Sequence, residues 1–70
     1  MTPLQAKIVH ALRTRVDMHN KVKVTFEEIA QELGVTKSEV NEALIDLRND
    51  GFFPGTPSLS AEQFCGRLPS

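Results

Sequence analysis

Residues 25–51 read TFEEIAQELGVTKSEVNEALIDLRNDG, a pattern typical of two capped helices joined by a tight glycine turn. Thr25 and Thr36 each stand three residues before a glutamate, which is the spacing of a capping box at a helix start. Gly34 follows the first apolar stripe, where a helix often ends in the left-handed conformation that glycine adopts easily. Gly51 closes the second stripe in the same way. The stretch therefore predicts two helices, at residues 26–33 and 36–50.

The same threonine signal opens the N-terminal part of the chain. Thr2 and Gln5 form a third box, and the proline after Thr2 suits the first helical position. The apolar residues that follow recur at helical spacing, and a short alternation of apolar and polar residues comes later. We therefore expect a helix at residues 3–18, a loop at 19–21 and a short strand at 22–25.

Past Gly51 the helical pattern stops. Phe52 and Phe53 form a short apolar pair of the kind found in strands. Pro54 and Pro57 then bracket a turn in which regular hydrogen bonding is impossible. This change divides the chain into a folded core, residues 1–57, and a C-terminal segment, residues 58–70.

The C-terminal segment has two readings. Residues 64–68 fit a strand that returns to pair with residues 52–53 and 22–25. Residues 60–63 fit instead a single capped helical turn. We favour a return strand or an irregular packed segment, with the chain frayed from Leu68 onward.

Length and composition indicate one small domain. The chain has 70 residues, of which 40 % are hydrophobic and 24 % are charged, as in an ordinary globular protein with a modest core. No apolar run approaches the ~18 residues of a membrane span. The start of the chain also lacks the apolar segment of a signal peptide. We therefore expect a cytoplasmic protein that does not bind membranes.

Few residues suggest catalytic or metal chemistry. Cys65 is the single cysteine, which excludes an intrachain disulfide and favours a packed or tail thiol. His10 and His19 do not stand at a spacing that would hold a metal. The sequence shows no nucleophile–base pair, phosphate-cradling glycine loop or carboxylate pair. We expect neither enzymatic activity nor a cofactor.

The formal net charge of −1 conceals a polarity along the chain. Residues 1–24 carry five cations against one acid, a net of +4. Residues 25–51 carry seven acids against two cations, a net of −5, and residues 52–70 carry one of each sign. The third predicted helix is therefore acidic.

One string in the helical region has the spacing of a known family. Residues 29–41 read IAQELGVTKSEVN, and Leu44, Leu47 and a Gly-Phe-Phe at 51–53 follow at regular spacing. Over residues 4–53 the chain resembles the winged helix-turn-helix superfamily of bacterial and phage regulators. The resemblance implies a mainly α protein with a small β part (α+β). In that fold three helices form a bundle, and the wing here would be short and degenerate.

In that superfamily the third helix lies in the DNA major groove, with its N-terminal half touching base edges. The resemblance therefore implies a transcriptional regulator that binds double-stranded DNA, with a homodimer compensating for weak binding by one copy. The implied contacts are Lys37, Ser38, Asn41, Glu42 and Ile45 in the groove, with Arg48 and Lys23 at phosphates. By residue type, Asn41 would read adenine, Lys37 guanine or phosphate, and Glu42 cytosine.

The chain also departs from the superfamily pattern. Its third helix carries more acids than cations, which opposes the counterion release that drives most DNA binding. The expected wing has an uncharged Pro-Gly-Thr-Pro stretch, and Arg67 is the only cation beyond it. The alternative is an interaction module or inhibitor that does not bind DNA and docks on a basic protein surface. The acidic residues that would serve it are Glu27, Glu28, Glu32 and Glu39.

Overall fold

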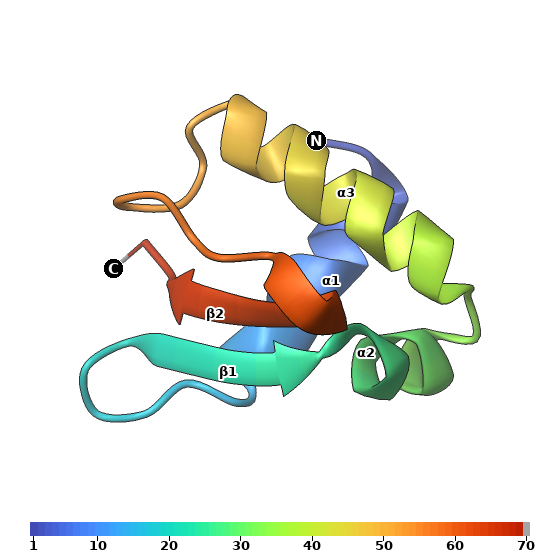
Figure 1. Cartoon of the computed structure of the whole chain (residues 1–70), viewed down its shortest axis with the longest axis horizontal. Helices are drawn as coiled ribbons and strands as arrows, with labels where there is room; N and C mark the ends of the chain where they lie inside the picture. The colour runs from blue at the N-terminus through green and yellow to red at the C-terminus, as the bar shows by residue number, and fades with distance from the viewer. Residues whose placement is uncertain (70) are drawn as a thin grey trace.

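The computed structural model describes residues 1–69, and Figure 1 shows their arrangement. Within these residues lie three α-helices, one short 3₁₀ helix and a two-stranded antiparallel sheet. In chain order the elements are α1 (Pro3–Arg13), β1 (Lys21–Thr25), α2 (Phe26–Leu33), α3 (Lys37–Asn49), η1 (Ser60–Glu62) and β2 (Gln63–Arg67). Helix α3 lies above the sheet in Figure 1, and α1 lies behind the sheet. The predicted α+β class is confirmed.

The helix starts follow from their threonine caps. The hydroxyls of Thr2 and Thr36 each accept a backbone N–H three residues on, and the side chain at that position returns the bond. The Thr25 hydroxyl accepts from the Glu28 N–H at 3.2 Å, but no return bond forms, so the third predicted box is only half made. Gly34 ends α2 with φ of 69°. The predicted bounds of α2 are confirmed, and those of α3 hold once its two capping residues are counted.

Helix α1 ends at Arg13, so the prediction of a helix reaching Met18 is wrong. The Thr14 hydroxyl donates to the Ala11 carbonyl oxygen at 2.7 Å, and the Arg15 guanidinium donates to the same oxygen at 2.8 Å. These bonds satisfy a carbonyl at the helix end that has no intrahelical partner, and so stabilise termination there.

Asp17 organises the turn that replaces the last helical turn. Its Oδ1 accepts hydrogen bonds from the backbone N–H of His19 at 2.8 Å and of Lys21 at 3.0 Å. Asn20 takes the left-handed conformation with φ of 64°, which asparagine tolerates better than most residues. Strand β1 begins directly after this turn.

The two strands pair antiparallel, with Val24 opposite Phe64. The predicted return strand is thus confirmed for its pairing with β1. The expected pairing with Phe52 and Phe53 does not form, because both residues lie in an irregular loop. The alternative, a capped helical turn at residues 60–63, is wrong in its cap: η1 lies at Ser60–Glu62, but no side chain caps it, and Ala61 and Glu62 have positive φ. A single bridge, Ser58 to Cys65, adds the only other ladder contact among residues 1–69.

Leu68 is packed, so the prediction that the chain frays from this residue is wrong. Its side chain is only 2 % exposed. Its N–H donates to the Asn20 carbonyl oxygen at 3.0 Å, and the Asn20 side-chain amide donates to the Leu68 carbonyl oxygen at 2.9 Å. The turn after α1 therefore fixes the end of β2.

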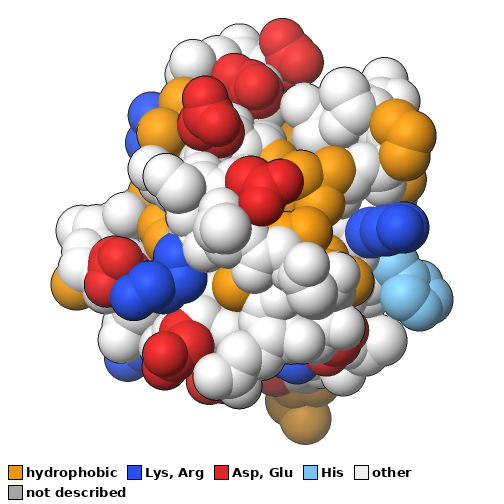
Figure 2. All heavy atoms as spheres, turned by 90° about the vertical axis from the view of Figure 1, so that its right-hand side faces the viewer, with side chains coloured by type: hydrophobic (Ala, Val, Ile, Leu, Met, Phe, Trp, Pro, Cys, Tyr) orange, Lys and Arg blue, Asp and Glu red, His pale blue; other side chains and the backbone are white. Residues whose placement is uncertain are grey.

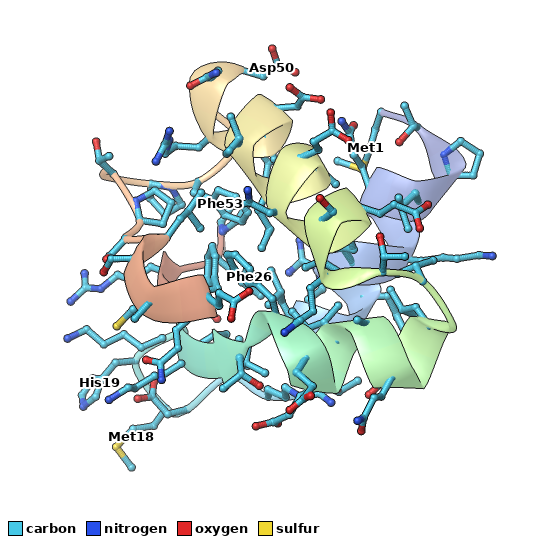
Figure 3. The ribbon with its side chains drawn as sticks, turned by 45° about the vertical axis from the view of Figure 1, so that its right-hand side comes forward. Met1, Met18, His19, Phe26, Asp50 and Phe53 are labelled. Atoms are coloured by element: carbon cyan, nitrogen blue, oxygen red, sulfur yellow. The ribbon has the colours of Figure 1, made fainter. Side chains whose placement is uncertain are left out.

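One hydrophobic core joins the helices, the sheet and the loop after α3. Phe26 and Phe53 point into the interior between α3 and the sheet (Figure 3). Phe53 packs on Phe64 with ring centroids 5.0 Å apart, and Phe64 is fully buried. The side chains of Val40, Ala43, Leu44 and Leu47 line the inner face of α3. This packing fixes which sides of α3 remain at the surface.

Candidate nucleic-acid interface

Three of the residues predicted to contact DNA come together at the N-terminal half of α3. Lys37, Ser38 and Asn41 line one open hollow of about 430 Å³. The other wall of the hollow is formed by Phe26, Leu59 and Glu62. Lys37 and Ser38 are exposed and Asn41 is half-buried, so all three can reach a ligand from solvent.

Glu42 follows Asn41 in sequence but lies on a different side of the helix. Consecutive helical residues are about 100° apart around the axis. Glu42 lines a second hollow of about 260 Å³, which is walled on the other side by Thr2, Leu4 and Gln5 at the start of α1. The structure therefore separates Glu42 from the other predicted groove residues.

The acids of α3 share this second side. Glu39 and Asp46 line the same hollow as Glu42. Figure 2 shows acidic side chains gathered over the upper part of the molecule, where α3 lies. The net negative charge of α3 is thus concentrated along the edge that faces α1, and the edge that carries Lys37 and Asn41 is less acidic than the sequence count implies.

The remaining predicted contacts on α3 lie further along the helix. Ile45 and Arg48 are both half-buried in its C-terminal half. Among residues 1–69, Arg48 takes part in neither of the two ion pairs. Its guanidinium is therefore available to an external anion.

Lys23 does not join the α3 hollow. It lies on the solvent face of the sheet, in a hollow of about 390 Å³ that also includes Lys21 and Arg67. The sheet lies below α3 in Figure 1. The structure thus places the basic residues of the sheet and the polar residues of α3 on separate elements.

Sequence reasoning missed the loop that faces α3. The Glu62 carboxylate lies 3.7 Å from the Lys37 ammonium, and both side chains are largely exposed. Ala61 and Glu62 have φ of 57° and 55°. Neither residue type favours positive φ, so the sequence offers no signal for the left-handed conformation of this turn. The loop brings a carboxylate to the cation that was expected to meet guanine or phosphate.

The acids proposed for protein docking do not form one free patch. Glu27 and Glu28 are exposed in the first turn of α2, where they complement the helix dipole. Glu32 accepts a 2.6 Å hydrogen bond from Arg15. The Glu39 carboxylate accepts from the Thr36 N–H at 3.1 Å. Two of the four carboxylates are therefore engaged within the fold.

The turn after α1 contains an acid with a shifted pKa. Hydrogen bonds from the backbone N–H groups of Lys21 and His19 hold the pKa of Asp17 below its ordinary value.

Across residues 1–69 no three His, Cys, Asp or Glu side chains lie close enough to bind a metal. None of the helices described has the length and apolar character needed to cross a membrane.

Comparisons with known proteins add no relative. No protein-family model matches the chain, and searches of curated proteins and of solved structures find no significant match. A functional assignment must therefore be argued from the residues and their geometry.

Proposed function

We propose that this chain is a small winged helix-turn-helix protein that binds duplex DNA through the N-terminal half of α3. The observation that carries the proposal is the shared hollow of Lys37, Ser38 and Asn41, three side chains that can bond base edges or phosphates. The acids of α3 that would repel DNA lie mainly on the other side of the helix. A polar edge of α3 that carries one cation, Lys37, supports this function.

The order of elements supports the winged form of the fold. β1 stands between α1 and α2, and β2 comes after α3 and pairs with β1. In this proposal the Ser58–Cys65 bridge would correspond to the strand pairing of the wing, and the loop from Leu59 to Glu62 to its tip. This short wing carries an acid where a cation would be expected, so α3 would supply the base contacts.

Each polar residue of the hollow has a defined role in the proposal. The Asn41 amide can accept from N6 and donate to N7 of adenine, a bidentate pair worth about 1–3 kcal/mol of discrimination. Lys37 would donate to guanine or to a phosphate, and the Ser38 hydroxyl to either. A homodimer on two half-sites about one DNA turn (~34 Å) apart would compensate for the small contact area of one copy.

The test is a fluorescence anisotropy titration of pooled labelled duplexes. We expect salt-sensitive binding by the wild-type protein. For the duplex that the wild type binds most tightly, Asn41→Ala should lose roughly 5- to 150-fold in affinity. Lys37→Ala should weaken binding to all duplexes alike and lower the salt slope by about 1. Asn49→Ala is the matched control, because it removes an exposed amide from the other end of α3.

The proposal fails if the wild-type protein binds no duplex at about 50 mM salt, where phosphate contacts are strong. It also fails if Asn41→Ala and Asn49→Ala bind equally well.

The alternative function is capture of a basic protein surface. It is favoured by the hollow in which Glu39, Glu42 and Asp46 lie beside Leu4. Glu42→Lys separates the two functions, because it would abolish capture of a basic partner but leave the edge of α3 that carries Lys37 and Asn41 unchanged. Loss of partner capture in a pull-down, with a wild-type protein that binds no duplex DNA, would favour the alternative.

A further inference from the structure

The solvent face of the sheet gathers three cations from both strands. In β1, Val22 and Val24 are buried, which turns Lys21 and Lys23 outward. In β2, the buried Phe64 turns Arg67 outward by the same alternation. The three exposed cations therefore share one face of a two-stranded sheet.

The register places two of these cations directly opposite each other. Lys21 pairs with Arg67, and Lys23 pairs with Cys65. Like charges at directly opposed positions destabilise an antiparallel pair. A fold that keeps such a pair has a local conflict, and conflicts of this kind are expected at functional sites.

The positive charge of this face is largely uncompensated within the described residues. Among residues 1–69, the two ion pairs involve other cations, Arg15 and Lys37. Asp17 is the single acid that lines the same hollow. Its carboxylate is held by the backbone N–H groups of His19 and Lys21 rather than by a cationic side chain. Three cations against one carboxylate leave the hollow with a formal charge of +2.

The rest of the molecule explains why this face matters for DNA. Non-specific affinity comes from cations that replace counterions at phosphates. On α3, Lys37 is paired with Glu62, and the other cation is the half-buried Arg48. These two cations alone provide few phosphate contacts, so a protein of net charge −1 would need further ones on another face. The outer sheet face is open, with a hollow of about 390 Å³, and has the guanidinium fork and ammonium groups that bind phosphate.

We propose that Lys21, Lys23 and Arg67, on the outer face of the sheet, bind the phosphodiester backbone of duplex DNA. The inference rests on the proposed DNA-binding function. It assigns the phosphate contacts to the sheet and the base contacts to α3. A row of cations fits a polyanion, because each neutralised phosphate releases counterions without demanding a base sequence.

The test measures DNA affinity against salt for the full chain, with Lys21→Gln, Lys23→Gln and Arg67→Gln made singly and together. Removal of one phosphate-binding cation should reduce the slope of log affinity against log salt by about 0.9, so the slope of the triple variant should fall by about 2.7. Lys7→Gln is the matched control, since it removes an exposed cation from α1. Circular dichroism should show unchanged folding, because all three side chains are exposed.

The outcomes separate this inference from the α3 proposal. If the triple variant keeps the wild-type slope while Asn41→Ala loses affinity, the sheet inference is wrong and the α3 proposal is supported. If the triple variant has a reduced slope while Asn41→Ala binds as the wild type does, the sheet inference is supported and the α3 proposal is wrong. Wild-type binding to vesicles of anionic phospholipid but not to duplex, abolished in the triple variant, would assign the face to a membrane and overturn both. If Lys7→Gln reduces the slope as much as each single sheet variant does, the attraction is generic, and this result also contradicts the sheet assignment.

Discussion

At the scale of single residues, the carboxylate of Glu62 decides how much of the Lys37 charge is available to a ligand. The two groups are 3.7 Å apart, and Glu62 follows Ala61 through two consecutive left-handed residues. Such backbone conformations cost energy in residues other than glycine and cluster at functional positions. The loop therefore holds an acid against α3 at a local cost.

Glu62→Gln should raise the affinity for duplex DNA about 1.4- to 5-fold at low salt, because an exposed ion pair of about 0.2–1 kcal/mol no longer competes for Lys37. A fluorescence anisotropy titration with labelled duplex measures the change. Glu27→Gln is the control, since Glu27 is an exposed acid on α2 outside both ion pairs of the described residues. Equal gains in the two variants would show that only net charge matters.

Gly66→Ala should destabilise the fold through a different residue-scale effect. A Cβ at Gly66 would stand 2.6 Å from the Pro57 Cβ and 3.1 Å from its Cα, so the backbone must move. Overpacking of this kind costs about 1–3 kcal/mol of unfolding free energy. Urea denaturation measures it, and Cys65→Ala, on the exposed side of the same strand, should change little. A Gly66→Ala variant as stable as the wild type would contradict the close approach of the two segments.

At the scale of elements, the turn after α1 depends on one ionised carboxylate. Backbone N–H donors lower the pKa of Asp17. A carboxyl whose pKa is lowered by folding stabilises the fold above its ordinary pKa of about 4. That contribution disappears as the pH falls through the lowered value and the carboxyl becomes protonated.

Asp17→Asn should therefore lower the unfolding free energy at neutral pH, and the difference from the wild type should shrink as the pH falls below about 4. Urea denaturation of both proteins at several pH values measures this. A difference that stays constant with pH would show that the charge of Asp17 does not stabilise the turn.

The elements differ in how far the sequence predicts them. The ends of α2 and the start of α3 are set by neighbours in sequence: Thr25, Thr36 and Gly34 form local caps, which sequence patterns capture well. The end of α1 depends on side-chain bonds to the Ala11 carbonyl oxygen, and the end of β2 depends on the meeting of Asn20 with Leu68, 48 residues apart in sequence. Such contacts leave no periodic signal.

The candidate site shows the same division. Helical spacing was enough to place Lys37, Ser38 and Asn41 near one another. It was not enough to predict that Glu42 lies toward α1, or that Lys23 lies apart from the α3 hollow, because both depend on packing between elements. Glu62 could not be foreseen, since its approach to Lys37 depends on a left-handed turn that its sequence does not favour.

At the scale of the whole molecule, charge is segregated among three surfaces. The sheet face is basic, the α1 side of α3 is acidic, and the hollow between α3 and the η1 loop is mixed. In the proposed complex, the first surface makes the phosphate contacts and the third reads the bases. The acidic side would then face away from DNA. Repulsion between its carboxylates and the phosphates would disfavour other orientations of the complex.

The central claim, that α3 reads DNA, is tested most directly by NMR chemical-shift mapping of the labelled protein titrated with duplex DNA at low salt. We predict the largest shifts at Lys37, Ser38 and Asn41, accompanied by Lys21, Lys23 and Arg67 on the sheet. Shifts confined to the sheet residues, with the α3 signals unmoved at saturation, would contradict the claim.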